Sequence, residues 1–233
     1  LRSAEDLNEG DVPGSVQSIV HSRVDNLEAM DKMALQAASV IGQNFSLELL
    51  RHLTDATQYT CSGLIEHLLV RPQDEDFGFT HALIRDGVYS SLLNSRKRAL
   101  HQRAAAWFES RDTTLCAQQL DHADNPRAAD IYADAAQSHA RNFHYDKALE
   151  LVRRAREIGG TPETIYRVHM LEGECLREAG QPGDSIDVYR LALEAAEDDI
   201  ARSRAWIGLA AGMRVTDDFD GAFDALSRAE DVA

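Results

Sequence analysis

Side chains that could do chemistry are sparse in this sequence, and His81 is the clearest of them. It follows a segment rich in phenylalanine and glycine and precedes an apolar-periodic stretch. An imidazole N–H at the start of a helix can donate a hydrogen bond to an anion. The same side chain could instead cap its helix or pack against the preceding segment. Arg85 and Asp86 follow about one turn later and could pair with a neighbouring domain or with each other. We interpret them as structural.

The common catalytic and metal-binding patterns are missing. Ser90 and Ser91 lack the flanking glycines of a nucleophile elbow. His139 and His144 are five residues apart, so a helix does not place them on one face. The acidic run at 217–220 lacks the closing glutamate of a calcium loop, and no G-x-x-x-x-G-K-[ST] phosphate loop occurs. We therefore predict that this chain is not an enzyme by itself and holds no metal or cofactor.

The chain is strongly acidic, with 39 acidic and 24 basic residues and a net charge of -15. Such a charge repels nucleic acid and anionic membranes at long range and favours solubility. Arg96, Lys97 and Arg98 form the one basic run of the first half. We interpret them as a contact to an acidic domain or as a solvated helix face, and do not expect binding to nucleic acid.

The composition indicates a globular protein, which we expect in the cytoplasm. The 233 residues are 44% hydrophobic and 27% charged, enough for one large domain or two ordinary ones. The longest apolar stretch, 33–42, is too short to span a membrane. Cys61, Cys116 and Cys175 are odd in number and far apart, as expected of reduced core thiols. Residues 2–14 do not form a signal peptide, and we expect the chain to be a segment of a longer protein.

Helical patterns dominate the first half. Apolar spacing predicts helices over 15–26, 30–41, 46–53, 61–70, 81–93 and 95–111. The pattern changes in RPQDEDFGFT, residues 71–80, where Pro72 disfavours a helix and Phe77 and Phe79 alternate with small residues. Three helices followed by such a hairpin suggest a winged helix.

The second half repeats itself every 37 residues. Large residues align at Tyr132, His169 and Trp206 and at Val152, Tyr189 and Leu226, while small ones align at Ala136, Gly173 and Ala210, at Ala148, Ser185 and Ala222, and at Ala155, Ala192 and Ala229. Small residues recur where two helices approach closely, so each unit is predicted to be a helical hairpin.

This pattern resembles the tetratricopeptide repeat, with units at 129–165, 166–202 and 203–233 and a period longer than that family's. In that family the first helix of each hairpin lines a concave groove. The resemblance assigns to this groove Arg167, Met170, Glu174, Arg177, Arg204, Ile207 and Arg214. A guanidinium group suits carboxylates, so the four arginines could hold an acidic peptide or domain. Alternatively, they are solvated or paired with acids one helical turn away.

A second resemblance covers the first half. The stretches LQAASVIGQNFSLELL (35–50) and FGFTHALIRDGVYSSLLNSRKRALHQRAAA (77–106) resemble the segment after the nucleotide-binding domain of bacterial signalling ATPases of the STAND group. Some members of that group carry an adenylate or guanylate cyclase domain, and others end in a LuxR-type DNA-binding domain. The implied fold is mainly α, with the end of an NTPase lid at 1–14, a winged-helix-like domain at 15–94, connecting helices at 95–128 and a tetratricopeptide-like solenoid at 129–233.

The function implied by this resemblance is regulatory and not catalytic. A protein or peptide bound to the repeats would shift an upstream NTPase in the same chain between ADP-bound and ATP-bound states, and ATP or ADP with Mg would belong to that parent. In related ATPases a histidine after the winged-helix hairpin contacts the β-phosphate of ADP, and His81 occupies this place. Two alternatives stay open: a free-standing adaptor for acidic peptides, and a winged-helix DNA-binding regulator. The effector domain, the ligand, the oligomeric state and any repeats after Ala233 are not indicated.

Overall fold

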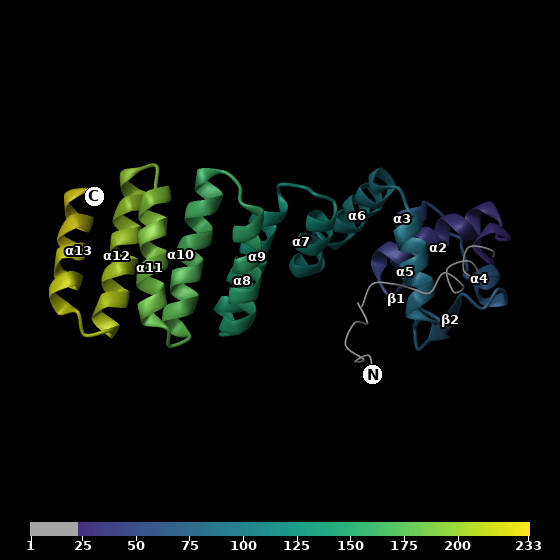
Figure 1. The fold of residues 1–233 in the computed structure, drawn as a ribbon, viewed down its shortest axis with the longest axis horizontal. Coiled ribbons are helices and arrows are strands. Elements are labelled where there is room, and N and C mark those ends of the chain that lie inside the picture. The colour runs from purple at the N-terminus through teal and green to yellow at the C-terminus, as the bar shows by residue number, and fades with distance from the viewer. Residues whose placement is uncertain (1–22) are drawn as a thin grey trace, which may run out of the picture. The chain divides into compact units, whose positions relative to one another are not determined.

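A computed structural model describes residues 23–233 of the chain. The predicted segment 1–14 and most of the predicted helix over 15–26 lie outside these residues. The fold is mainly helical with one small antiparallel sheet, as the sequence predicted (Figure 1). The chain forms two compact units, which divide after Trp107.

The first unit combines short helices with a three-stranded sheet in the order β1-β3-β2. Its elements are α2 (Ala29–Ile41), β1 (Asn44–Phe45), α3 (Leu47–Thr54), α4 (Ser62–Glu66), β2 (Val70–Gln73), β3 (Asp76–Phe79), α5 (Ala82–Ser91) and α6 (Asn94–Phe108).

The helix predicted over 61–70 ends earlier than expected, so that prediction was wrong at its C-terminal end. Leu68 adopts a left-handed backbone conformation (φ 56°), which stops the helix, and Val70 already pairs with Phe79 in the sheet.

Hydrogen bonds fix the end of β3 and hence the start of α5. The backbone N–H of Phe79 donates to the carbonyl of Gln43 at 2.9 Å, and that of Thr80 donates to the carbonyl of Leu69 at 3.1 Å. The Thr80 hydroxyl also donates to the carbonyl of Leu68 at 2.8 Å. These hydrogen bonds hold the backbone just before His81 in place.

The second unit consists of helices that pack in sequential pairs (Figure 1). Its elements are α7 (Thr113–His122), α8 (Ala128–Arg141), α9 (Tyr145–Ile158), α10 (Pro162–Glu178), α11 (Pro182–Ala195), α12 (Asp199–Val215) and α13 (Phe219–Asp231). The last six form three hairpins, which begin at Ala128, Pro162 and Asp199, between one and four residues before the predicted units. The predicted helical-hairpin repeat is thus confirmed, and the small residues at its aligned positions are buried.

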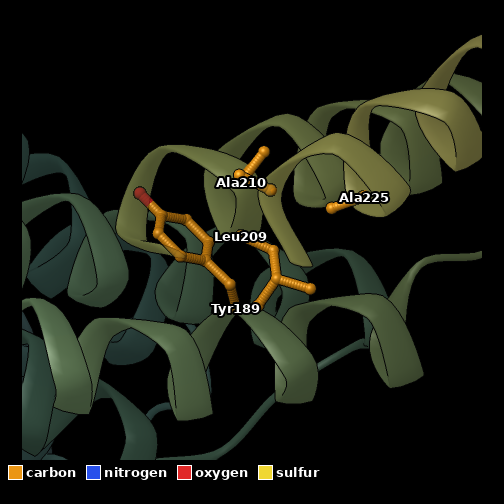
Figure 2. Close-up of a cluster of buried hydrophobic side chains, with 5 residues drawn as sticks. Tyr189, Leu209, Ala210 and Ala225 are labelled. Atoms are coloured by element: carbon orange, nitrogen blue, oxygen red, sulfur yellow. The ribbon is translucent and has the colours of Figure 1, made fainter. Parts of the chain in front are cut away.

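The second and third hairpins are joined by a large side chain that packs between them. The ring of Tyr189 on α11 lies against Gly173 of α10 and Gly208 of α12. A Cβ atom at Gly208 would lie only 2.4 Å from Cε1 of Tyr189, so neither position tolerates a side chain without movement. Figure 2 shows Tyr189 beside Leu209 and Ala210 of α12, with Ala225 of α13 close by.

Candidate binding face of the helical repeat

The exposed sides of α8, α10 and α12 form the surface on which the sequence placed its candidate groove residues, and we call this surface the groove face. Helix α10 contacts both α8 and α12. Its opposite side is buried, with Val168, Leu171 and Cys175 in the core. The helical period therefore turns residues such as Glu174 outwards.

A pocket of about 230 Å³ opens on the groove face between α8 and α10. It is lined by Gln137, Arg167, Met170, Leu171, Glu174, Arg177 and Tyr189. The structure thus brings together four of the seven candidate groove residues. Tyr189 reaches the pocket from α11 because Gly173 has no side chain in its path. Burial raises the pKa of Tyr189 to about 12, so its hydroxyl stays protonated at neutral pH.

Two of the candidate arginines pair with acids. Arg167 forms an ion pair with Asp134 on α8, and Nη2 of Arg177 lies 2.8 Å from Oε1 of Glu178. Partly exposed ion pairs of this kind contribute between about 0 and 1 kcal/mol, so a bound partner could displace them at little cost. Glu174 is exposed and forms no ion pair with any described residue.

A second, larger pocket of about 520 Å³ lies between α10 and α12. Its lining consists of Glu163, Tyr166, Arg167, Ala195, Glu197, Asp198, Ile200, Ala201 and Arg204. Arg167 borders both pockets and connects them. The Tyr166 hydroxyl donates to the carbonyl of Ala201 at 3.0 Å and joins the two helices. Three carboxylates and two guanidinium groups give this pocket a mixed charge.

The other two candidates lie on α12 outside both pockets. Ile207 and Arg214 are exposed, and neither lines either cavity. The groove face is therefore formed mainly by α10, and α12 contributes Arg204 to it.

Sequence reasoning overlooked part of the pocket lining. Tyr189 comes from a second helix, and Glu197 and Asp198 lie between α11 and α12, whereas the repeat pattern assigns only first helices to the groove. A signal for Tyr189 was present: Gly173 and Gly208 are glycines inside predicted helices, where a close approach of another group is the usual reason for glycine.

His81 lies in the first unit, at the position before α5. Its side chain is exposed and does not cap the helix, while its backbone carbonyl accepts a hydrogen bond from the N–H of Ile84 at 3.0 Å. Arg85 donates from Nε to the carbonyl of Ser39 at 3.0 Å and pairs with Asp86 at 2.9 Å. Of the two pairings expected for Arg85 and Asp86, the structure contains the one with each other. The imidazole of His81 is left accessible.

The basic cluster lies on α6 and is partly used inside the first unit. Nζ of Lys97 lies 4.6 Å from the centre of the Tyr89 ring, and Arg103 pairs with Asp55 at 2.6 Å. Arg96 and Arg98 are exposed, as expected of a solvated helix face, whereas Lys97 packs within the unit.

The described residues contain no group of three or more His, Cys, Asp or Glu side chains that could hold a metal ion. All three cysteines are buried and free. Burial raises the pKa of the Cys61 and Cys175 thiols to about 12, so neither is a nucleophile at neutral pH. Between residues 23 and 233, no helix is both long and apolar enough to cross a membrane.

Comparisons with known proteins give one relative in sequence. No family model matches the chain. An uncharacterized protein of Rhizobium meliloti strain 1021, R02095, is 29% identical over 143 residues. The match includes 53% of this chain but only 13% of that protein, so the chain spans a small part of its relative's length.

Two kinds of solved structure resemble the fold. MamA MSR-1 matches 64% of this chain and 83% of its own, with 14% identity and a TM-score of 0.42. A STAND protein with a tetratricopeptide repeat sensor from Pyrococcus horikoshii matches 97% of this chain and 47% of its own, with 11% identity and a TM-score of 0.43. Both scores are low, so the description of the fold rests on the helices and contacts of this chain.

Proposed function

We propose that the groove face binds a segment of a partner protein. The observation that carries this proposal is the pocket between α8 and α10, in which Met170 offers apolar surface beside the polar groups of Tyr189, Glu174 and Arg177. Binding sites typically combine an apolar lining with a few convergent polar groups. Helical-repeat surfaces that span several hairpins suit extended segments.

A selection from a random peptide library tests this proposal with the chain as bait. We expect recovered peptides to lose binding with Glu174→Lys, which reverses a charge in the pocket at an exposed position. Glu194→Lys is the matched control, because Glu194 is exposed on α11 and lines neither pocket. If no peptide is recovered, or if both variants bind equally well, the groove face is not the binding surface.

We further propose that the chain is the non-catalytic regulatory part of a longer signalling NTPase of the STAND group. Binding on the repeats would then shift the nucleotide state of an AAA-like domain of the same protein, which supplies the ATP or ADP and Mg. The proposal is supported by the sequence resemblance of residues 35–50 and 77–106 and by the much greater length of the relative. The topology of the first unit, with β3 central in the sheet, suits the proposed winged helix.

In this proposal His81 contacts the nucleotide. Its exposed imidazole lies at the start of α5 and makes no capping hydrogen bond, so an N–H donor is available for a phosphate oxygen. The sequence contains no phosphate loop, so in this proposal the AAA-like domain supplies the phosphate-binding loop and His81 adds one contact.

A free-standing adaptor for acidic peptides is the second candidate, and two arginines favour it. Arg204 and Arg214 are exposed on α12 and form no ion pair with any described residue. Such an adaptor would bind a glutamate-rich peptide without any nucleotide. The affinity would fall with added salt, and also with Arg177→Ala and Arg204→Ala, because both changes remove a positive charge.

A further inference from the structure

The two pockets of the groove face are lined by ionised side chains of both signs. The carboxylates are Glu163, Glu174, Glu197 and Asp198, and the guanidinium groups are those of Arg167, Arg177 and Arg204. Because the two sets are similar in size, the charge that a ligand meets depends on which of these groups the chain itself already neutralises.

Acids outside the pocket linings neutralise most of the guanidinium groups. Arg167 forms an ion pair with Asp134. Arg177 donates to Oε1 of Glu178 from both Nε, at 3.2 Å, and Nη2, at 2.8 Å. Neither of these acids lines a pocket, so each pair presents no net charge to a ligand. Of the three guanidinium groups, only that of Arg204 forms no ion pair with a residue that the structure describes.

Most of the carboxylates, in contrast, have no cationic partner. Glu163 and Glu174 are exposed on α10 and Glu197 is exposed between α11 and α12, and none of them forms an ion pair within residues 23–233. Asp198 accepts a hydrogen bond from a backbone N–H of α12 at 2.7 Å and caps that helix. The larger pocket borders the first turns of α10 and α12, and each helix N-terminus carries about +0.5 elementary charge. These two ends and Arg204 offset only part of the three carboxylates, so the surplus charge is negative.

The charge of the whole chain acts in the same direction. Its net charge of -15 attracts cationic ligands at long range and repels acidic segments. Arg204 and Arg214 favour an acidic peptide when they are considered alone. They do not reverse the charge of the pockets, because Arg214 lines neither of them.

We propose that the segment bound by the groove face is basic. One Lys or Arg side chain lies beside Glu174 in the pocket between α8 and α10, and a second lies beside Glu163 and Glu197 in the pocket between α10 and α12. Met170, between these two sites on α10, contacts an apolar side chain of the segment. This inference rests on the proposed peptide binding and names the chemistry of the peptide.

The length of α10 sets the spacing of the two basic residues. Glu163 and Glu174 are 11 residues apart, which corresponds to about 16 Å along the helix. An extended segment covers this length in about five residues. The probe is therefore a fluorescein-labelled peptide with the sequence Lys-Ser-Leu-Leu-Ser-Lys, whose side-chain pattern is the same in both directions.

Anisotropy titration of the probe with the chain should show saturable binding. The binding should weaken when the salt concentration rises from about 50 to about 500 mM, because salt screens exposed charges. A peptide with Glu in place of both Lys residues should bind at least about tenfold more weakly.

A matched pair of double variants separates the pockets from the overall charge. Glu163→Gln with Glu197→Gln should weaken binding of the lysine peptide at least about fivefold. Glu194→Gln with Glu230→Gln is the control, because it changes the net charge equally at exposed positions that line neither pocket. Equal binding by the two double variants overturns the inference, since only the overall charge would then matter.

Two further results overturn the inference and differ in what they mean for the proposed function. If the glutamate peptide binds as tightly as the lysine peptide or more tightly, the groove face binds peptides but is not selective for basic ones. If neither peptide binds, the inference also fails, and the library selection then decides whether the groove face binds peptides at all.

Discussion

At the scale of the residue, the three hairpin turns share one unusual backbone conformation. Phe143, Gly180 and Asp217 are spaced by 37 residues, and all have positive φ angles of 62°, 80° and 61°. Glycine adopts this conformation without strain, and Asp and Asn tolerate it better than other residues do. All three turns therefore keep the same backbone geometry although the residue at this position differs. A residue other than glycine there lowers the stability of the fold.

Two glycines of the second hairpin allow a matched test of this cost. A Cβ atom at Gly180 or at Gly183 would meet no other atom within 4 Å, but only Gly180 has a positive φ. Gly180→Ala should lower the free energy of unfolding by about 1 kcal/mol. Gly183→Ala, inside α11, should raise it by about 0.5 kcal/mol, because alanine favours the helix. Urea denaturation measures both, and a loss of stability in both variants would contradict this explanation.

At the scale of the element, the two contacts between successive hairpins place their larger and smaller side chains on opposite helices. Tyr189 lies opposite Gly208, whereas the equivalent positions of the preceding contact hold Val152 and Leu171. A large residue on the second helix is thus matched with a small one on the next helix, and the reverse. A larger side chain on one helix is compensated by a smaller one on the other, which explains how repeats of different sequence keep the same packing between helices.

A double-mutant cycle tests whether the side chains at positions 189 and 208 compensate for each other in size. Tyr189→Val should destabilise the protein by about 2–4 kcal/mol by leaving a cavity, and Gly208→Leu should destabilise it by at least about 1–3 kcal/mol by overpacking. The double variant reproduces the pair of the preceding contact, so it should recover at least about 1 kcal/mol relative to the sum. Strictly additive losses in chemical denaturation would show that the two side chains do not compensate.

Sequence patterns predicted the elements with long periodicity and missed those set by tertiary contacts. The three hairpins follow from the 37-residue period, and the strand at Phe77 and Phe79 follows from alternation. Strand β1 has only two residues, too few for any pattern, and the early end of α4 depends on Leu68. The candidate groove residues on α10 came from the resemblance to the tetratricopeptide repeat, which assigns only first helices to the groove. Tyr189 lies on a second helix, so its signal was indirect, in the glycines at 173 and 208.

At the scale of the whole molecule, buried proton donors make stability depend on pH in the alkaline range. Burial raises the pKa of Cys61 and Cys175 from 9.0, and that of Tyr132 and Tyr189 from 10.0, to about 12. Between about pH 9 and 12 the unfolded chain loses these protons and the folded chain keeps them, so stability falls as pH rises.

Chemical denaturation at pH 8, 10 and 11 measures this fall. We expect the midpoint to decrease steadily above about pH 9, and Cys175→Ala should make the decrease shallower, because one of the perturbed groups is removed. A midpoint that stays constant to pH 11 would contradict the burial of these groups.

The regulatory proposal depends on a link between the first unit and a nucleotide. The most direct measurement is the nucleotide content of the parent NTPase that the proposal implies. It is purified as wild type, His81→Ala and the control His67→Ala, and its nucleotide is determined after denaturing extraction. His67 is exposed in the same unit but belongs to the end of α4. We predict bound ADP in the wild type and in His67→Ala, and loss or faster exchange of ADP in His81→Ala. Equal retention in all three proteins, or no nucleotide in any of them, would contradict the proposed role.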